Sequence, residues 1–225
     1  MKTIYICGDS FASVDADYPG VSWTEQLASM VDARIVNLSF VAASNLLISI
    51  QVQHAIQAQA DYVICLGTTV TREELKLPNK QQHTDLLDRF WSFQRNNNTD
   101  KDLMSYSWLT IENYPVNQNL VREFYTQYFD LDLAIYRNQC IIENTLQKLT
   151  DSGIPFMFDQ GGFEHKSFGG LAKEYFTKYK NNISSINLWD YAVGKKNLKP
   201  YFHFTDPAMH TPIAEYYAEK IKAAI

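Results

Sequence analysis

Ser10 stands where an apolar run at the start of the chain ends, in the stretch Ile6-Cys-Gly-Asp-Ser-Phe11. A serine is a weak nucleophile unless a base lies within hydrogen-bond reach, an orienting group holds that base, and donors stabilise the oxyanion. Near the other end of the chain, His210 follows Asp206 by four residues. A carboxylate so close can hold the imidazole tautomer and stabilise the imidazolium. These residue types predict acyl transfer by a catalytic triad.

The elements that must position these side chains alternate between strands and helices. Apolar runs bounded by turn residues predict five strands: the run at the start of the chain that stops at Gly8, and residues 33–38, 61–66, 154–158 and 183–189. Between them the apolar residues recur at helical spacing, and a Ser22/Glu25 capping box and Pro212 open two of the predicted helices. This alternation predicts an α/β fold, a three-layer α/β/α sandwich with a five-stranded parallel sheet in the flavodoxin-like order 2-1-3-4-5.

One segment interrupts the alternation. Residues 73–119 combine scattered aromatic side chains with a polar stretch around Asn96-Asn-Asn-Thr-Asp100, and we interpret them as an insertion that forms either a lid over the site or a packing patch. A helical pattern from Leu120 to Leu149 follows, with a break predicted at Asp130 to Asp132. A chain of 225 residues without an evident linker predicts a single domain over residues 1–225.

Composition narrows the classes of partner. A net charge of -5 argues against a nucleic-acid partner, because such proteins usually carry a basic patch. Cys7, Cys65 and Cys140 are an odd number at spacings that fit neither a disulfide framework nor a zinc site, so reduced thiols are predicted. The sequence carries no membrane-spanning run and opens directly on a strand without a signal pattern, which predicts a cytoplasmic location. Composition and motifs leave the oligomeric state open.

The motifs resemble those of one hydrolase family. Gly8-Asp-Ser-Phe11 looks like the first block of the SGNH hydrolases, also called GDSL-type esterases and lipases. The resemblance continues through Ser22 to Leu27, Asn37 to Asn45 and Asp61 to Gly67, and it returns in the block from Asp206 to His210. It therefore covers both ends of the chain and leaves the insertion outside.

The resemblance implies roles for individual residues. It places the nucleophile on Ser10, the base on His210 and the orienting acid on Asp206. The oxyanion donors fall on the N–H of Ser10, the N–H of Ala42 and the side chain of Thr69.

Three positions depart from the family pattern. Ala42 replaces a glycine, Thr69 replaces an asparagine whose side chain reaches further, and the block from Asp206 to His210 is one residue longer than Asp-x-x-His.

The resemblance also bears on the ligand. It implies an ester substrate of the acetylated-sugar, lipid or small-acyl class, and neither a metal nor an organic cofactor. Three further residues, Asp9, Asn45 and Arg72, are candidates for substrate contacts, and Arg72 is also a candidate for the positive charge that an asparagine donor no longer supplies. Gly67-Thr-Thr together with Arg72 is similar to some phage-encoded members, which implies a virion or host-cytoplasm location.

Alternatives remain at this stage. His203, between two phenylalanines, is an alternative base or a packed structural histidine, and Ser10 on its own is as compatible with a helix cap as with a nucleophile. A non-catalytic glycan- or protein-binding module on the same fold would tolerate the altered oxyanion positions. A flavodoxin-like nucleotide binder shares the strand order, although the sequence lacks a phosphate loop.

Overall fold

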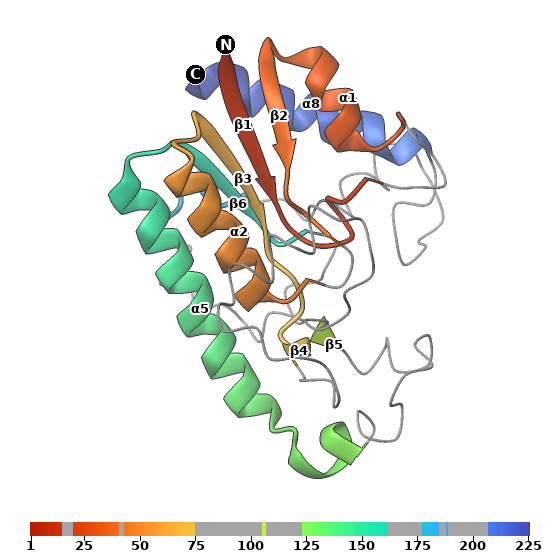
Figure 1. Ribbon diagram of the computed structural model, residues 1–225, viewed down its shortest axis with the longest axis vertical. Helices are drawn as coiled ribbons and strands as arrows, with labels where there is room; N and C mark the ends of the chain where they lie inside the picture. The colour runs from red at the N-terminus through yellow and green to blue at the C-terminus, as the bar shows by residue number, and fades with distance from the viewer. Residues whose placement is uncertain are drawn as a thin grey trace, which may run out of the picture.

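A computed structural model describes residues 1–14, 20–40, 43–74, 105–106, 123–161, 177–184, 188 and 207–225 (Figure 1). The strands are β1 (Lys2–Cys7), β2 (Ala33–Asn37), β3 (Tyr62–Leu66), β4 (Glu73–Glu74), β5 (Ser105–Tyr106) and β6 (Phe156–Asp159). The helices are α1 (Trp23–Met30), α2 (Asn45–Gln57), the short π-helix η2 (Phe124–Tyr128), α5 (Leu131–Ser152) and α8 (Pro207–Ala224). The predicted α/β alternation is confirmed.

Four strands form the main sheet, all parallel, in the order β2-β1-β3-β6. The first four predicted strands therefore have the predicted order. The structure corrects the prediction of a fifth strand over residues 183–189. Its described part forms only an isolated parallel bridge between Ile183 and Phe158, in which Ser184 N–H donates to the Phe158 carbonyl at 2.8 Å.

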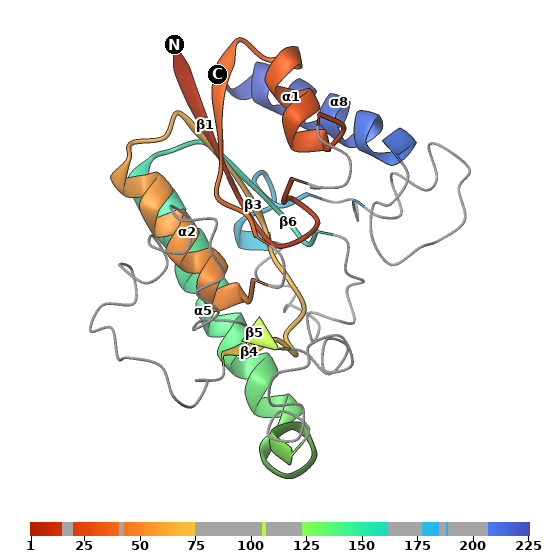
Figure 2. The same cartoon turned by 45° about the vertical axis from the view of Figure 1, so that its right-hand side comes forward.

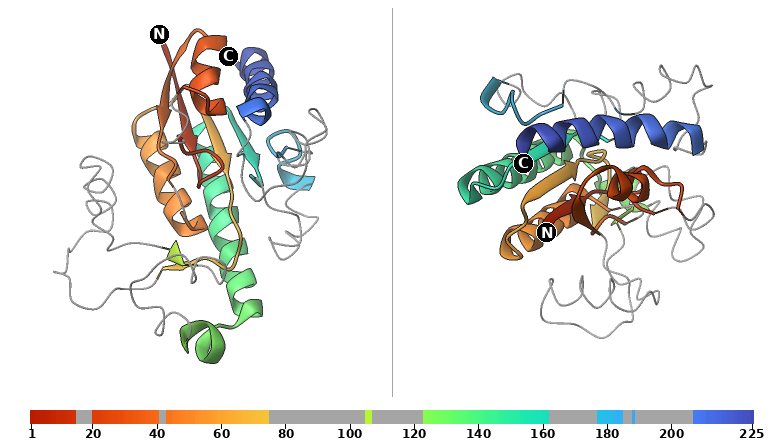
Figure 3. Two further views of the ribbon diagram at one scale, coloured as in Figure 1. Left: turned by 90° about the vertical axis from the view of Figure 1, so that its right-hand side faces the viewer. Right: turned by 90° about the horizontal axis from the view of Figure 1, so that it is seen from above.

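Helices cover both faces of the sheet (Figure 3). Helices α1 and α8 pack against each other on one face, and α2 and α5 pack against each other on the other. Every residue of β3 is buried, as expected for a strand covered on both sides. The largest fully buried side chains come from the strands and from the inner faces of the helices: Trp23, Tyr217, Phe158, Ile4, Ile6, Leu27, Leu47, Ile64, Leu66, Leu146 and Leu149.

Local signals explain where most helices begin and end. The capping box predicted for α1 is present, with Ser22 Oγ accepting from Glu25 N–H and Glu25 Oε2 accepting from Ser22 N–H. The predicted break near Asp130 separates η2 from α5, where Asp130 caps the long helix. Gly153 ends α5 in the left-handed conformation, with φ of 68°, which favours glycine.

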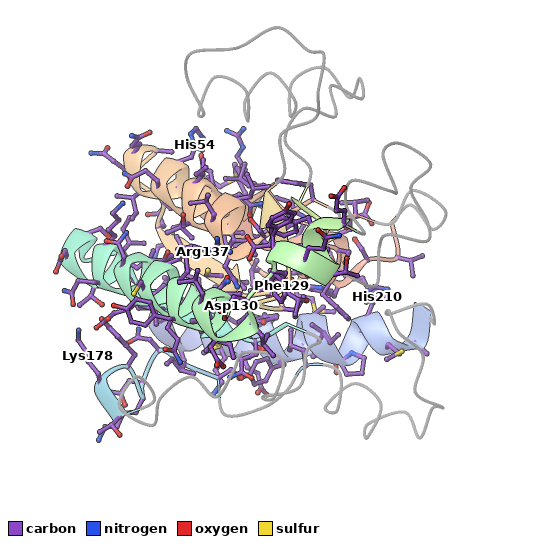
Figure 4. The ribbon with its side chains drawn as sticks, turned by 90° about the horizontal axis from the view of Figure 1, so that it is seen from below. His54, Phe129, Asp130, Arg137, Lys178 and His210 are labelled. Atoms are coloured by element: carbon purple, nitrogen blue, oxygen red, sulfur yellow. The ribbon has the colours of Figure 1, made fainter. Side chains whose placement is uncertain are left out.

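The last helix begins earlier than predicted. Helix α8 starts at Pro207 rather than at Pro212, which lies inside it. A proline in the first helical position sacrifices no hydrogen bond, and this explains why Pro207 opens the helix. His210 consequently lies in the first turn of α8 and not in a loop (Figure 4).

The segment that we interpret as an insertion is described only in part. Its first two residues form β4, which pairs antiparallel with β5 beside the N-terminal half of α5 (Figure 2). The ranges 75–104 and 107–119 lie outside the described residues. That the insertion forms a lid therefore stays a prediction. In the described part of the chain, no helix is long and apolar enough to span a membrane.

Candidate active site

The turn that follows β1 places Ser10 at the carboxyl edge of the sheet. Ser10 is partly buried, and the turn closes directly behind it through a hydrogen bond of 3.0 Å from Ala12 N–H to the Asp9 carbonyl. A Cβ atom on Gly8 would lie 3.1 Å from the Cβ atoms of both Ala12 and Leu66. Glycine therefore allows the chain to turn tightly against β3 just before Ser10.

Two carboxamides from α2 hold the ends of neighbouring strands. Gln51 accepts from Gly8 N–H at 2.6 Å and donates to the Gly8 carbonyl at 3.1 Å. Asn45 forms the same pair of bonds with Thr68, which follows β3. It accepts from Thr68 N–H and donates to the Thr68 carbonyl, both at 3.0 Å. Asn45 also donates to Asn138 of α5 at 2.8 Å. We call Gln51 and Asn45 the carboxamide clamps. They fix the backbone that follows β1 and β3 at the sheet edge where Ser10 lies.

A buried ion pair lies beside the nucleophile turn. Arg72 donates from Nη1 to Asp9 Oδ2 at 2.7 Å, and the side chains of Arg72 and Asp9 are 5% and 0% exposed. The same Nη1 donates to the Ala43 carbonyl at 3.0 Å. The carboxylate of Asp9 also accepts from Thr68 Oγ1 at 2.8 Å and from Phe11 N–H at 3.0 Å. One carboxylate and one guanidinium thus connect three separate segments at the edge of the sheet.

Trp23 joins the far end of the chain to the nucleophile turn. Its backbone N–H donates to Nδ1 of His210 at 3.0 Å, and its indole N–H donates to the carbonyl of Phe11 at 2.7 Å. Its ring stacks on Tyr217 of α8 with centroids 4.8 Å apart. His210 is 7% exposed. One residue therefore holds both the predicted base and the residue next to Ser10.

The hydrogen bond from Trp23 sets the proton on the imidazole of His210. A nitrogen that accepts from a backbone N–H carries no proton, so a neutral ring in this position carries its proton on Nε2. In a catalytic triad Nδ1 instead carries a proton and donates a hydrogen bond to the orienting carboxylate. The described arrangement is therefore the opposite tautomer to that of a triad histidine.

The remaining predicted site residues fall into three groups. Thr69 is 7% exposed, and its Oγ1 lies 3.1 Å from Thr71 Oγ1 and accepts from Thr71 N–H at 3.4 Å. Ala42, Asp206 and His203 lie outside the described residues. Of the predicted substrate contacts, Asp9, Asn45 and Arg72 are all buried, and each is engaged by neighbouring backbone or side chains.

A second group of polar side chains lies at the end of β6, under α8. Asp159 is fully buried, and burial raises the pKa of its carboxyl to about 7, although the nearby Ser184 hydroxyl and the N–H groups of Gly161 and Gln160 offset part of the rise. Its Oδ1 accepts from Gly161 N–H at 3.1 Å. The Tyr217 hydroxyl lies close by without reaching hydrogen-bond geometry, and burial, followed by the charge of Asp159, raises the pKa of that phenol.

Sequence reasoning missed the residues that fasten the site. Gln51 and Asn138 sit within helical patterns where polar residues look like ordinary solvent-facing positions, and Trp23 looks like a core residue of α1. Only a three-dimensional arrangement reveals that their polar atoms meet loop backbone. Among the described residues, no group of three or more His, Cys, Asp or Glu side chains could hold a metal ion.

Comparisons with known proteins identify the fold. Neither the protein-family models nor the curated protein sequences contain a match to this chain. Solved structures do resemble it over nearly its whole length. They include TesA (TM-score 0.56, 10% identity, 100% of both chains) and the psychrotrophic esterase EstA from Pseudoalteromonas sp. inhibited by monoethylphosphonate (0.52, 11%, 99% of this chain and 100% of that one).

The acetyl xylan esterase AlAXEase is also similar, with a TM-score of 0.51, 8% identity and 99% of both chains covered. At such identities the likeness concerns the fold. The chain has the SGNH hydrolase fold that the motifs predicted.

Proposed function

We propose that this protein is a serine hydrolase that cleaves a carboxylic ester through an acyl-enzyme on Ser10. The observation that carries the proposal is the position of Trp23, which bonds to His210 through its backbone and to the Phe11 carbonyl through its indole. A nucleophile-type turn and a histidine almost 200 residues apart in sequence are thereby held by one residue at the carboxyl edge of a parallel sheet, where ligands bind in open α/β folds.

The reaction proceeds in two acyl-transfer steps. Ser10 Oγ attacks the ester carbonyl carbon while His210 takes the hydroxyl proton, and the resulting oxyanion is stabilised by N–H groups at Ser10 and Ala42 and by Thr69. His210 then protonates the departing alcohol as the carbon–oxygen bond breaks. Water, deprotonated by His210, attacks the acyl-Ser10 ester, and collapse of the second intermediate returns the proton to Ser10 and releases the carboxylic acid.

The base must change its hydrogen bond to do this. Acceptance of the Ser10 proton at Nε2 requires the ring's own proton to move to Nδ1, and Nδ1 in the resting arrangement accepts from Trp23 N–H. We assign Asp206 as the acceptor that replaces Trp23 when Nδ1 becomes protonated. The spacing from Asp206 to His210 is one residue longer than the Asp-x-x-His of the family pattern.

The test uses a panel of esters and a reactive-serine probe. We expect hydrolysis of p-nitrophenyl acetate and covalent labelling of Ser10 by a fluorophosphonate, located by mass spectrometry. Ser10→Ala abolishes labelling and lowers kcat/KM by at least about 10³-fold. The control is Ser13→Ala in the same turn, in which we expect the probe to label Ser10 as in wild type. Equal activity of wild type and Ser10→Ala, with no labelling of Ser10, would overturn the proposal.

The substrate class is the finer part of the proposal. A small acyl group on a sugar is the first class to test, because one protein of the same fold is an acetyl xylan esterase. Acetylated xylo-oligosaccharides, short p-nitrophenyl esters and a long-chain ester compared at equal concentration rank the three classes by kcat/KM.

One observation favours a second candidate, a non-catalytic glycan-binding module on the same fold. His210 is held in the tautomer that does not accept the Ser10 proton at Nε2. If the protein is such a module, we expect titration calorimetry to show that wild type and Ser10→Ala bind an acetylated oligosaccharide equally. We then expect neither protein to release acetate.

A further inference from the structure

The three predicted oxyanion donors lie in three separate segments of the chain. Ser10 follows β1, Ala42 precedes α2 and Thr69 follows β3. Donors stabilise a developing oxyanion only when they are fixed relative to one another before the reaction, because reorganisation during the reaction would cost the energy that they supply. Something must therefore set the distances between these segments.

The ion pair between Arg72 and Asp9 contacts all three segments. Asp9 precedes Ser10 and accepts from Phe11 N–H on its other side. Arg72 donates to the carbonyl of Ala43, the residue after Ala42. Asp9 also accepts from the hydroxyl of Thr68, the residue before Thr69. Every donor thus has an immediate sequence neighbour bonded to this pair.

Burial strengthens the hydrogen bonds and the ion pair of Asp9 and Arg72. The Asp9 side chain is fully buried, and that of Arg72 is 5% exposed. Hydrogen bonds between ionised groups are roughly twice as strong as neutral ones, and they weaken little with salt where water is excluded. Since the guanidinium charge faces a carboxylate at 2.7 Å, it is neutralised within the protein.

We propose that Arg72 is a positioning residue, which together with Asp9 sets the relative placement of the three oxyanion donors and does not bind an anionic group of the substrate. This inference rests on the proposed ester hydrolysis. From the motifs alone, Arg72 is a candidate both for a substrate contact and for a source of positive charge at the oxyanion site. The proposal assigns it neither of these roles.

The first test separates positioning from substrate binding. Arg72→Met is assayed with two esters of matched length, neutral p-nitrophenyl butyrate and anionic p-nitrophenyl succinate. We expect kcat to fall by about 10²-fold for both, the effect of a displacement near 1 Å, with the ratio of the two KM values unchanged. A rise of KM confined to the anionic ester would assign Arg72 to substrate binding and overturn the inference.

The second test separates positioning from stability. Removal of one partner leaves a buried charge unpaired, so Arg72→Met alone lowers the melting temperature. The double variant Asp9→Asn/Arg72→Met removes both charges. We expect the double variant to recover most of the melting temperature while its kcat stays low. Arg72→Lys keeps the charge and can donate to one partner, so we expect it to retain part of the wild-type kcat. Full recovery of kcat in the double variant would mean that the pair is merely structural.

A matched control lies one residue further along. Glu73 is buried and pairs with Arg137 of α5, which Figure 4 labels and whose side chain is 47% exposed. Among the described residues, the side chains of this pair form no hydrogen bond to Asp9, Ala43 or Thr68. We expect Arg137→Met to keep kcat within about twofold, as substitutions away from reacting groups usually do. Wild-type protein that neither hydrolyses an ester nor reacts with a fluorophosphonate refutes the proposed function and this inference together. An active wild type with undiminished kcat in Arg72→Met refutes the inference alone.

Discussion

The backbone N–H of Trp23 donates to Nδ1 of His210 at 3.0 Å, so a residue at the start of α1 fixes the ring of a histidine in the first turn of α8. The bond fixes the position of the predicted base and also its tautomer. It shows that in the resting protein a backbone N–H occupies the nitrogen that the orienting acid of a triad would hold.

This relationship predicts the nitrogen NMR signature of His210. In protein labelled with ¹⁵N-histidine at a pH where the ring is neutral, we expect Nδ1 to resonate as an unprotonated nitrogen and Nε2 to carry the proton. His210→Gln assigns the signal. A spectrum with the proton on Nδ1 would show that an acid, and not Trp23, holds the ring in solution.

The indole of Trp23 gives a second prediction. Trp23→Phe keeps an aromatic ring to stack on Tyr217 and removes the donor to the Phe11 carbonyl. A buried carbonyl without its partner costs about 1–3 kcal/mol, so we expect the free energy of unfolding to fall by roughly that amount in urea denaturation. We also expect kcat to fall and KM to change little, because the Phe11 carbonyl adjoins Ser10. Unchanged stability would mean that the Phe11 carbonyl finds another donor.

The carboxamide clamp at Gly8 gives a third prediction. Gln51→Met is close in volume but can form neither hydrogen bond to Gly8, and it leaves the buried Gly8 N–H without this acceptor and the Gly8 carbonyl with only the longer bond of 3.4 Å from Phe40 N–H. We expect a loss of about 2–4 kcal/mol in the free energy of unfolding, at the upper end for a single polar substitution. Gln57→Met, at the exposed end of the same helix, is the control and should lie within about 0.5 kcal/mol of wild type.

Asp159 gives a prediction for the pH dependence of stability. Because burial raises the pKa of this carboxyl from 3.8 to about 7, the folded protein holds a proton there that the unfolded chain has already lost, a difference of up to about 4 kcal/mol. The contribution to stability is present below pH 4 and is lost as the pH rises through about 7. Asp159→Asn, which stays neutral, should gain melting temperature relative to wild type across that window.

The control for this prediction is Asp132→Asn, at the exposed start of α5. As an exposed substitution away from Asp159, it should change the melting temperature near pH 7 by far less than Asp159→Asn does. If Asp159→Asn also followed wild type, the carboxyl would titrate alike in the folded and unfolded chain.

Much of the architecture could be predicted because the signals are local. Continuous apolar runs marked the strands, and the Ser22/Glu25 box marked the start of α1, since each depends on residues a few positions apart. The start of α8 could not be fixed in this way, because Pro207 and Pro212 are both acceptable first residues of a helix and only packing decides between them.

The contacts that fasten the site depend on the tertiary fold. Gln51 meets Gly8 from 43 positions away, and Trp23 meets His210 from 187 positions away. No spacing rule links such residues. The motif could therefore indicate where a nucleophile and a base stand in the sequence, and it gave no sign of the groups that hold them.

The nucleophile turn is held from both sides of the sheet, and the base from one side. Gln51 holds the turn from the α2 and α5 side, whereas Trp23, which also bonds to the Phe11 carbonyl, and His210 belong to the α1 and α8 side (Figure 3). Partial unfolding confined to α8 would consequently carry away the base while the Ser10 turn keeps its native backbone. Such a state would be catalytically silent yet still largely folded, and amide hydrogen exchange in α8 would report on it before global unfolding does.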